Sequence, residues 1–172
     1  MANHTILAEG DHVAQLIQQR LVHTPGIPLD GMEIIGRARR LALLSRGAIE
    51  AVFERFGLDT GEFDVLSTLQ RAGPPYRLRP TELFETLMVS SGGMTDRLRR
   101  LEKRGLISRE PNSEDGRSLL VQLSDEGLSL IGEAFTEDML AEEEILAPLD
   151  REERMHLATL LAKLLIELEI EK

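Results

Sequence analysis

The sequence predicts a mainly α-helical protein with one small β-hairpin. Apolar residues recur at helical spacing along most of the 172 residues, and short segments rich in Gly, Pro and polar residues separate these stretches. Two neighbouring stretches, 106–110 and 118–123, have the composition of strands, and the segment between them has that of a turn. We therefore expect helices at both ends of the chain and a small central lobe that contains the hairpin.

The N-terminal third contains two expected helices. The first lies in an N-terminal arm formed by residues 1–30, and residues 24–28 break it because they include two prolines and a glycine. Its apolar residues at helical spacing are Val13, Leu16, Ile17 and Leu21. The second runs from Met32 to Phe56 and ends at Gly57, since glycine readily adopts the left-handed conformation that follows helices.

The central lobe, residues 58–123, begins with a predicted helix from Thr60 to Arg71, which the segment 73–75 stops. Its inward residues are Phe63, Leu66 and Leu69. A short strand over 76–79 and a helix over 80–87 follow, because proline at position 80 suits the first turn of a helix.

The second half of the lobe is one more helix and the hairpin. The hydroxyls of Ser90 and Ser91 are expected to cap a helix that runs to Arg104 and ends at Gly105. The hairpin strands follow, joined by the polar segment 111–116. This order of elements predicts a winged helix-turn-helix lobe.

The C-terminal third is expected to form two long helices. Ser124 caps the first, which continues to Leu146, and Asp150 and Glu153 have capping-box spacing for the second. The second helix has a leucine stripe that consists of Leu157, Leu160, Leu161, Leu164, Leu165 and Leu168. Since a small lobe cannot cover these stripes, residues 31–57 and 124–172 are predicted to form a helical dimerisation region. An intramolecular core is the alternative.

Charge is distributed unevenly along the chain, whose net charge is -10. Residues 124–172 contain fourteen acidic and four basic residues, whereas residues 90–117 contain seven basic and five acidic residues. Phosphates attract cations, so any contact with nucleic acid would have to be local to the central stretch.

A helix, a tight turn and a second helix are expected over residues 83–98, as in DNA-binding helix-turn-helix segments. The second helix of such a segment enters the major groove, and backbone N–H groups at its N-terminal end can meet a phosphate. The residues predicted to contact DNA here are Ser90, Ser91, Gly92, Gly93, Thr95, Arg97, Arg100 and Arg104. A basic surface helix of no special function is the alternative.

The turn of the hairpin ends in Asp115, Gly116 and Arg117. An arginine near a hairpin tip can enter a narrow minor groove, where the potential is most negative. We predict that Arg117 contacts DNA and that Asp115 orients it. A solvated turn arginine is the alternative.

These segments together resemble the MarR family of winged helix-turn-helix transcriptional regulators. The resemblance rests on residues 89–98 (VSSGGMTDRL), 101–107 (LEKRGLI), 115–117 (DGR) and 121–127 (VQLSDEG), in that order. It implies a homodimer with interlocked terminal helices that binds double-stranded DNA at a pseudo-palindromic operator. Members are typically repressors that a small anion, phenolic compound, metal or oxidant releases.

One position departs from the family pattern. Relatives with a similar Ser-Ser-Gly-Gly-Met-Thr run often carry a neutral amide where this chain has Asp96. A carboxylate there either pairs with Arg100, one helical turn away, or is repelled by phosphate. We therefore do not expect Asp96 to read a base.

The resemblance also implies an effector pocket between the dimer helices and the winged lobe. Arg46 and Arg55, in the second half of the first long helix, are candidates to meet an anionic or phenolic effector. A surface ion pair is the alternative for each. Since the chain has no cysteine, sensing of oxidants through thiols is excluded.

Other function classes find little support. No Gly-rich phosphate loop follows a strand and no nucleophile elbow occurs, so we expect neither enzymatic activity nor a cofactor. No metal site is expected, because the histidines lack ligand spacing: His4, His12, His23 and His156. Without a membrane-spanning run or signal peptide, a cytoplasmic location is expected. The alternative function is a winged-helix protein-interaction adaptor without physiological DNA binding.

Overall fold

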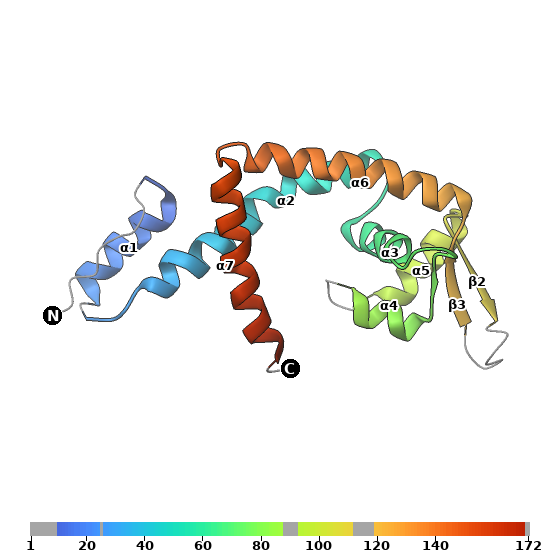
Figure 1. Ribbon diagram of the computed structural model, residues 1–172, viewed down its shortest axis with the longest axis horizontal. Helices are drawn as coiled ribbons and strands as arrows, with labels where there is room; N and C mark the ends of the chain where they lie inside the picture. Colours follow the sequence, from blue (N-terminus) through green and yellow to red (C-terminus); the bar gives the residue numbers. More distant parts are fainter. Residues whose placement is uncertain (1–9, 25, 88–92, 112–118, 171–172) are drawn as a thin grey trace. The chain divides into compact units, whose positions relative to one another are not determined.

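A computed structural model describes residues 10–24, 26–87, 93–111 and 119–170 (Figure 1). The chain divides into two compact units, residues 1–48 and residues 49–172. The described elements are mainly helices with one small antiparallel sheet, as the sequence predicts. Among the described residues, no helix is both long and apolar enough to cross a membrane.

The first unit contains α1 (His12–His23), a π-helical turn (Met32–Gly36) and most of α2 (Arg37–Arg55). Asp11 caps α1 by accepting a hydrogen bond from the backbone N–H of Ala14 at 2.8 Å. The buried side chains of this unit include Val13, Ile17 and Leu29, which pack together. The single helix predicted from Met32 to Phe56 is wrong in its first turn, because apolar periodicity cannot distinguish one wide π turn from an α turn.

The second unit contains the elements expected of the lobe and the C-terminal helices. Its helices are α3 (Thr60–Arg71), α4 (Pro80–Thr86), α5 (Met94–Lys103), α6 (Asp125–Leu146) and α7 (Arg151–Ile170). Its strands are β1 (Arg77–Leu78), β2 (Ile107–Pro111) and β3 (Leu119–Leu123). The strand order is β1-β3-β2, and both pairs are antiparallel. The register pairs Ile107 with Leu123 and Arg77 with Gln122, so the two strands of the predicted hairpin are present.

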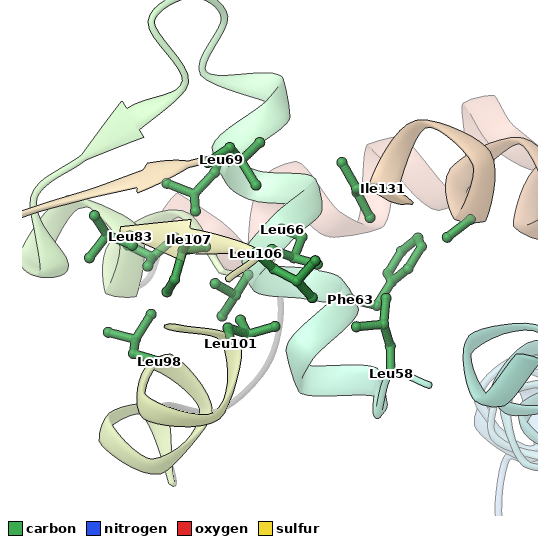
Figure 2. Close-up of a cluster of buried hydrophobic side chains, with 14 of the residues drawn as sticks. Leu58, Phe63, Leu66, Leu69, Leu83, Leu98, Leu101, Leu106, Ile107 and Ile131 are labelled. Atoms are coloured by element: carbon green, nitrogen blue, oxygen red, sulfur yellow. The ribbon is translucent and has the colours of Figure 1, made fainter. Parts of the chain in front are cut away.

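One apolar core holds the second unit together. Figure 2 shows that leucines from α3, α4 and α5 converge on Ile107 of β2, and that Ile131 of α6 approaches Phe63 from another side. The least exposed side chains of this core include Val65, Leu66, Leu69, Leu83, Leu101, Val121 and Ile131. Burial of each leucine contributes on the order of 2 kcal/mol, so this core fixes α5 against α3.

Close backbone contact fixes the start of α6 beside the sheet. Ser124 caps α6 as predicted, and its hydroxyl accepts a hydrogen bond from the N–H of Gly127 at 2.9 Å. A Cβ atom at Gly127 would clash with the carbonyl oxygen of Leu106. Glycine is therefore required where the helix passes the strand.

The start of α5 differs from the prediction. The N-cap residue is Gly93, whose φ of 78° lies in the left-handed region, whereas the predicted capping residues Ser90 and Ser91 lie outside the described residues. A glycine adopts this conformation without the steric cost of a side chain. Gly93 has no side chain that could accept from the first N–H groups of α5.

The predicted capping box at the start of α7 is confirmed. Asp150 accepts from the N–H of Glu153, and Glu153 accepts from the N–H of Asp150, each at 2.9 Å. No described residue of α7 is buried. Its leucine stripe is between 39% and 61% exposed at Leu157, Leu160, Leu161, Leu164, Leu165 and Leu168.

Candidate nucleic-acid interface

Helix α5 has an outer face of polar and basic side chains. Thr95, Arg99 and Lys103 follow one another at intervals of four, so they lie along one side of the helix. All three are exposed, and the Arg99 side chain is 72% exposed. A surface hollow of about 210 Å³ is lined by Arg99, Arg100 and Lys103. This face presents two exposed cations, Arg99 and Lys103, to an anionic partner.

Asp96 lies beside this outer face. Its carboxylate accepts a hydrogen bond from Arg99 at 3.1 Å, one turn along the helix. The pairing with Arg100, one of the two alternatives that the sequence left open for Asp96, is therefore replaced by a pairing with Arg99. Arg100 instead donates to the acidic groups Glu62 and Asp59 at the start of α3. An exposed pair such as Asp96–Arg99 contributes less than about 1 kcal/mol, so a phosphate can compete for Arg99.

The adjacent side of α5, which carries Arg97, Arg100 and Arg104 and is called its inner face, is bound to the start of α3, although the Arg100 side chain remains 46% exposed. Arg100 donates to Glu62 at 2.7 Å and to Asp59 at 2.5 Å. Asp59 and Glu62 also form the capping box of α3, with hydrogen bonds of 2.8 and 3.1 Å to each other's backbone N–H. Hydrogen bonding to Glu62 raises the pKa of Arg100. Since Glu62 is only 5% exposed, this ion pair is a fixed part of the lobe.

Arg104, at the end of α5, extends the same attachment. Its guanidinium donates to the carbonyl oxygens of Gly57 at 2.7 Å and Phe56 at 3.3 Å, and it lies 3.7 Å from Glu62. These carbonyls belong to the turn between α2 and α3. The side chain therefore spans from α5 to the segment that precedes α3.

Arg97 also points toward α3. Its side chain is half-buried, and a Cβ atom at Gly61 would clash with its guanidinium, so the two helices approach closely there. Among the described residues, its Nη1 atom is buried without a hydrogen-bond partner. Burial raises the pKa of the nearby Asp64 carboxyl, and the charge of Arg97 only partly opposes this shift. The structure therefore places the Arg97 side chain between α5 and α3 rather than on the outer face of α5.

The hairpin is attached to α5 by one more ion pair. Arg109 of β2 donates through Nε to Glu102 at 2.9 Å, and its Nη2 contacts the same carboxylate oxygen. Hydrogen bonding to Arg109 lowers the pKa of Glu102. The strand that leads into the predicted wing is thus positioned by the helix that precedes it.

The predicted DNA-contact residues fall into three groups. Ser90, Ser91, Gly92, Asp115 and Arg117 lie outside the described residues. Gly93 and Thr95 are exposed at the start of α5, whereas Arg97, Arg100 and Arg104 face α3.

Sequence reasoning did not single out Arg99, Lys103, Asp59 or Glu62. Signals for them were present: Arg99 and Lys103 continue the spacing of four from Thr95, and Asp59-x-x-Glu62 has the spacing of a capping box. Both signals are local patterns, but the meeting of Glu62 with Arg100 spans 38 positions of sequence.

The two arginines predicted for an effector pocket lie in different settings. Arg46 is exposed in the first unit. Arg55 lines an open surface cavity of about 620 Å³ between the end of α2 and α6, where it pairs with Glu137 at 3.0 Å. The Arg55 side chain is 60% exposed. Its contact with Glu137 is therefore the surface ion pair that the sequence left open as the alternative to an effector contact.

A second cavity, of about 300 Å³, lies among α2, α3 and α6 within the second unit. Asp64 of α3 and Asp138 of α6 both line it. Burial raises the pKa of Asp138 to about 6, and the negative charges of Glu142 and Asp64 act in the same direction. Asp138 follows Ile131 and Ala134 along the buried face of α6, and a charged residue at such a position was the signal that sequence reasoning missed.

Comparisons with known proteins agree with this geometry. Residues 56–118 match the model of the MarR family. The HTH-type transcriptional regulator PecS of Dickeya dadantii is 38% identical over 151 residues, which cover 88% of this chain and 91% of PecS.

Two solved structures share the fold. A mutant of MarR from E. coli complexed with operator DNA has a TM-score of 0.65 at 23% identity, over 91% of this chain and 99% of that one. BpsR of Bordetella bronchiseptica, whose DNA binding is regulated by 6-hydroxynicotinic acid, has a TM-score of 0.69 at 19% identity, over 81% of this chain and 97% of that one.

Proposed function

Since the chain belongs to the MarR family and is a transcriptional regulator of the MarR type, we propose that it binds a pseudo-palindromic operator as a homodimer. In this proposal it represses transcription until a small molecule releases it. The action takes place in the cytoplasm, where the DNA of a bacterium lies, and involves no enzymatic step.

The observation that supports DNA binding most strongly is that one face of α5 is bonded to the start of α3 and the other is exposed. Arg100 and Arg104 fasten the inner face to the start of α3, while Thr95, Arg99 and Lys103 are exposed on the outer face. A helix that enters a major groove needs a fixed orientation and free polar or basic side chains.

The contacts with DNA follow from this division. In our proposal the outer-face side chains and the backbone of residues 90–93 contact the major groove and its phosphates. Arg97, Arg100 and Arg104, which the sequence grouped with them, act instead by positioning α5. Arg117 enters the minor groove from the hairpin, and Asp115 orients it.

Dimerisation is supported by apolar surface that the described chain leaves uncovered. The leucine stripe of α7 has the length and spacing of a helix that packs against a partner, and α7 buries none of its described residues. A two-fold operator also calls for a two-fold protein. Sedimentation velocity of Leu161→Glu should show a smaller species than the wild-type chain, and an unchanged dimer would exclude this helix from the interface.

Operator binding is tested by selecting bound fragments from genomic DNA with the full-length protein. We expect enrichment of fragments that share a pseudo-palindromic sequence, and binding that weakens steeply with salt. In gel-shift titrations of such a fragment, Arg117→Ala should weaken binding without changing the dimer. Failure to enrich any fragment would favour the alternative, a protein-interaction adaptor.

Release by a small molecule is supported by the cavities beside α6 and by the fold shared with BpsR. The sequence resemblance favours an anionic or phenolic effector that meets Arg55 or Arg46. A screen for compounds that lower the affinity for the selected fragment tests this step separately from DNA binding. If no compound changes the affinity, regulation by release is excluded for the compounds screened, while DNA binding stands.

A further inference from the structure

The short strand β1 carries two exposed arginines immediately before the helix-turn-helix. Arg77 lies in β1, and Arg79 follows it in an extended conformation with φ of -67° and ψ of 149°. Successive side chains of an extended chain point to opposite sides, so these two arginines lie on the same side. Both are exposed, whereas Leu78 between them is half-buried. Arg77 and Arg79 are called the β1 pair below.

The register of the sheet places the β1 pair on its solvent side. Arg77 lies opposite Gln122 of β3, and Leu78 lies opposite Val121. Val121 is fully buried, and Leu78 packs against the same core. The side of β1 that carries Leu78 therefore faces the core, and the side that carries the β1 pair faces away from it.

The direction of β1 brings Arg79 toward the hairpin end of the sheet. Because β3 is antiparallel to both β1 and β2, these two strands run in the same direction. β2 ends at Pro111, opposite Leu119, where the segment that joins the hairpin strands begins. The residues paired with β1 run from Gln122 to Val121, toward Leu119. The chain therefore leaves β1 toward the end of the sheet at which the hairpin turns.

The β1 pair also differs from the arginines of α5 and β2 in its lack of an acidic partner. Arg99, Arg100 and Arg109 each donate to a carboxylate. Within the described ranges, neither member of the β1 pair forms an ion pair. The carboxylate of Glu82, at the start of α4, instead accepts from the backbone N–H of Arg79 at 2.8 Å. Two guanidinium groups on one side of the sheet are thus left for an external anion.

We propose that the β1 pair binds phosphates of the operator backbone next to the groove that α5 enters. β1 leads directly into α4, the first helix of the helix-turn-helix, and such a helix crosses the DNA backbone while the second lies in the major groove. Guanidinium groups bind phosphate oxygens through charge-assisted hydrogen bonds. The inference rests on the proposed function and adds a contact that neither α5 nor the hairpin turn supplies.

The test is a titration of the selected DNA fragment with full-length protein at several salt concentrations. Arg77→Gln/Arg79→Gln removes two phosphate contacts, so the slope of log Kd against log salt concentration should fall by about 1.8. Binding near 0.1 M salt should weaken roughly 50-fold. Arg77→Lys/Arg79→Lys retains both charges and should retain most of the slope. A glutamine variant with the slope and affinity of wild type would overturn the proposal.

A matched control separates contact from net charge. Arg151→Gln/Lys163→Gln removes the same charge from two exposed positions of α7, outside the winged lobe. Its slope should stay within about 0.5 of the wild-type slope, because a phosphate that is not contacted releases no counterion. Sedimentation velocity and thermal unfolding should show that both double variants keep the wild-type size and stability, since the four side chains are exposed. An equal fall of the slope in the control would refute a local contact.

Random-sequence duplex DNA separates a phosphate contact from a base contact. Phosphates are the same in every sequence, so Arg77→Gln/Arg79→Gln should weaken binding by a similar factor on the selected fragment and on random-sequence DNA. A loss confined to the selected fragment would contradict a phosphate contact.

The outcome for wild type distinguishes this inference from the proposed function. Wild-type protein that binds the fragment no better than the glutamine variant does contradicts the inference and leaves the proposed function intact. Wild-type protein that retains no DNA fragment contradicts the proposed function and, with it, this inference.

Discussion

Two charged clusters lie against α3, and they differ in how their carboxylates are satisfied. The α3–α5 cluster is formed by Asp59, Glu62, Arg100 and Arg104. Arg100 pairs with Asp59 at 2.5 Å and with Glu62 at 2.7 Å, and Arg104 lies 3.7 Å from Glu62. The α3–α6 cluster consists of Asp64, Asp138, Glu142 and Arg71. There, one oxygen of Asp64 and one of Asp138 are buried with no donor in the described part of the chain.

The difference shows two uses of buried charge on one helix. In the α3–α5 cluster, the ion pairs fix the orientation of α5. Removal of one partner leaves the charge of the other without compensation. In the α3–α6 cluster, buried acids without a donor among the described residues cost stability. Each of the following predictions tests one side of this comparison.

The largest effect on stability is expected at the unpaired cluster. The pKa of Asp138 is raised from 3.8 to about 6, so the folded state holds its proton more tightly than the unfolded state does. Asp138 therefore lowers the free energy of unfolding as the pH rises from about 4 to 6. Asp138→Asn should be more stable than wild type at pH 7 by about 2–3 kcal/mol in urea unfolding.

Measurement across pH distinguishes this cause from a packing effect. The extra free energy of unfolding of Asp138→Asn over wild type should shrink to near zero below pH 4, where the Asp138 carboxyl becomes protonated in both the folded and the unfolded state. A gain that did not change between pH 4 and pH 7 would show that ionisation of Asp138 is not its source.

The paired cluster should respond in the opposite direction. Arg100→Met removes the partner of the buried Glu62 and should lower the free energy of unfolding at pH 7 by about 1–2 kcal/mol, because Arg100 itself is partly solvated. Arg99→Met removes the same charge from the outer face of the same helix, and a change within about 0.5 kcal/mol is expected. An equal decrease in the free energy of unfolding in both variants would contradict the claim that the two faces of α5 differ.

A smaller effect is expected at Gly61, where α3 touches Arg97 of α5. Replacement of a helical glycine by alanine usually stabilises a protein by up to about 1 kcal/mol. Gly61→Ala should instead be neutral or destabilising by roughly 1 kcal/mol, because its methyl group must displace the Arg97 guanidinium.

The control for Gly61→Ala is Gly132→Ala in α6, where a Cβ would meet only Gln70 at 3.7 Å. This control should show the usual gain in thermal unfolding. A similar gain at Gly61 would mean that Arg97 yields freely and does not help to position α5.

Local patterns in the sequence predicted most of the fold. Apolar periodicity placed α3 from Thr60 to Arg71, and capping residues placed the starts of α6 and α7 at Ser124 and Asp150, as observed. The start of α5 could not be placed in this way, because the two serines are as suitable for a cap as the glycine that occupies that position.

For the candidate interface, the sequence indicated which residue types lie on α5 but not the direction in which each side chain points. The arginines of α5 are alike in sequence, and only contact with α3, some 40 residues earlier, separates Arg100 from Arg99. The cavity acids were missed for the same reason, since Asp64 and Asp138 meet only when α3 packs against α6. Contacts between residues distant in sequence decide both features.

The central claim is that the outer face of α5 contacts DNA phosphates while its inner face only positions the helix. The most direct measurement is the salt dependence of affinity for a selected fragment, compared between wild type and Arg99→Gln/Lys103→Gln. Two lost phosphate contacts should reduce the slope of log Kd against log salt concentration by about 1.8 and weaken binding roughly 50-fold near 0.1 M salt. A parallel line for the double variant, with the same affinity as wild type, would contradict the claim.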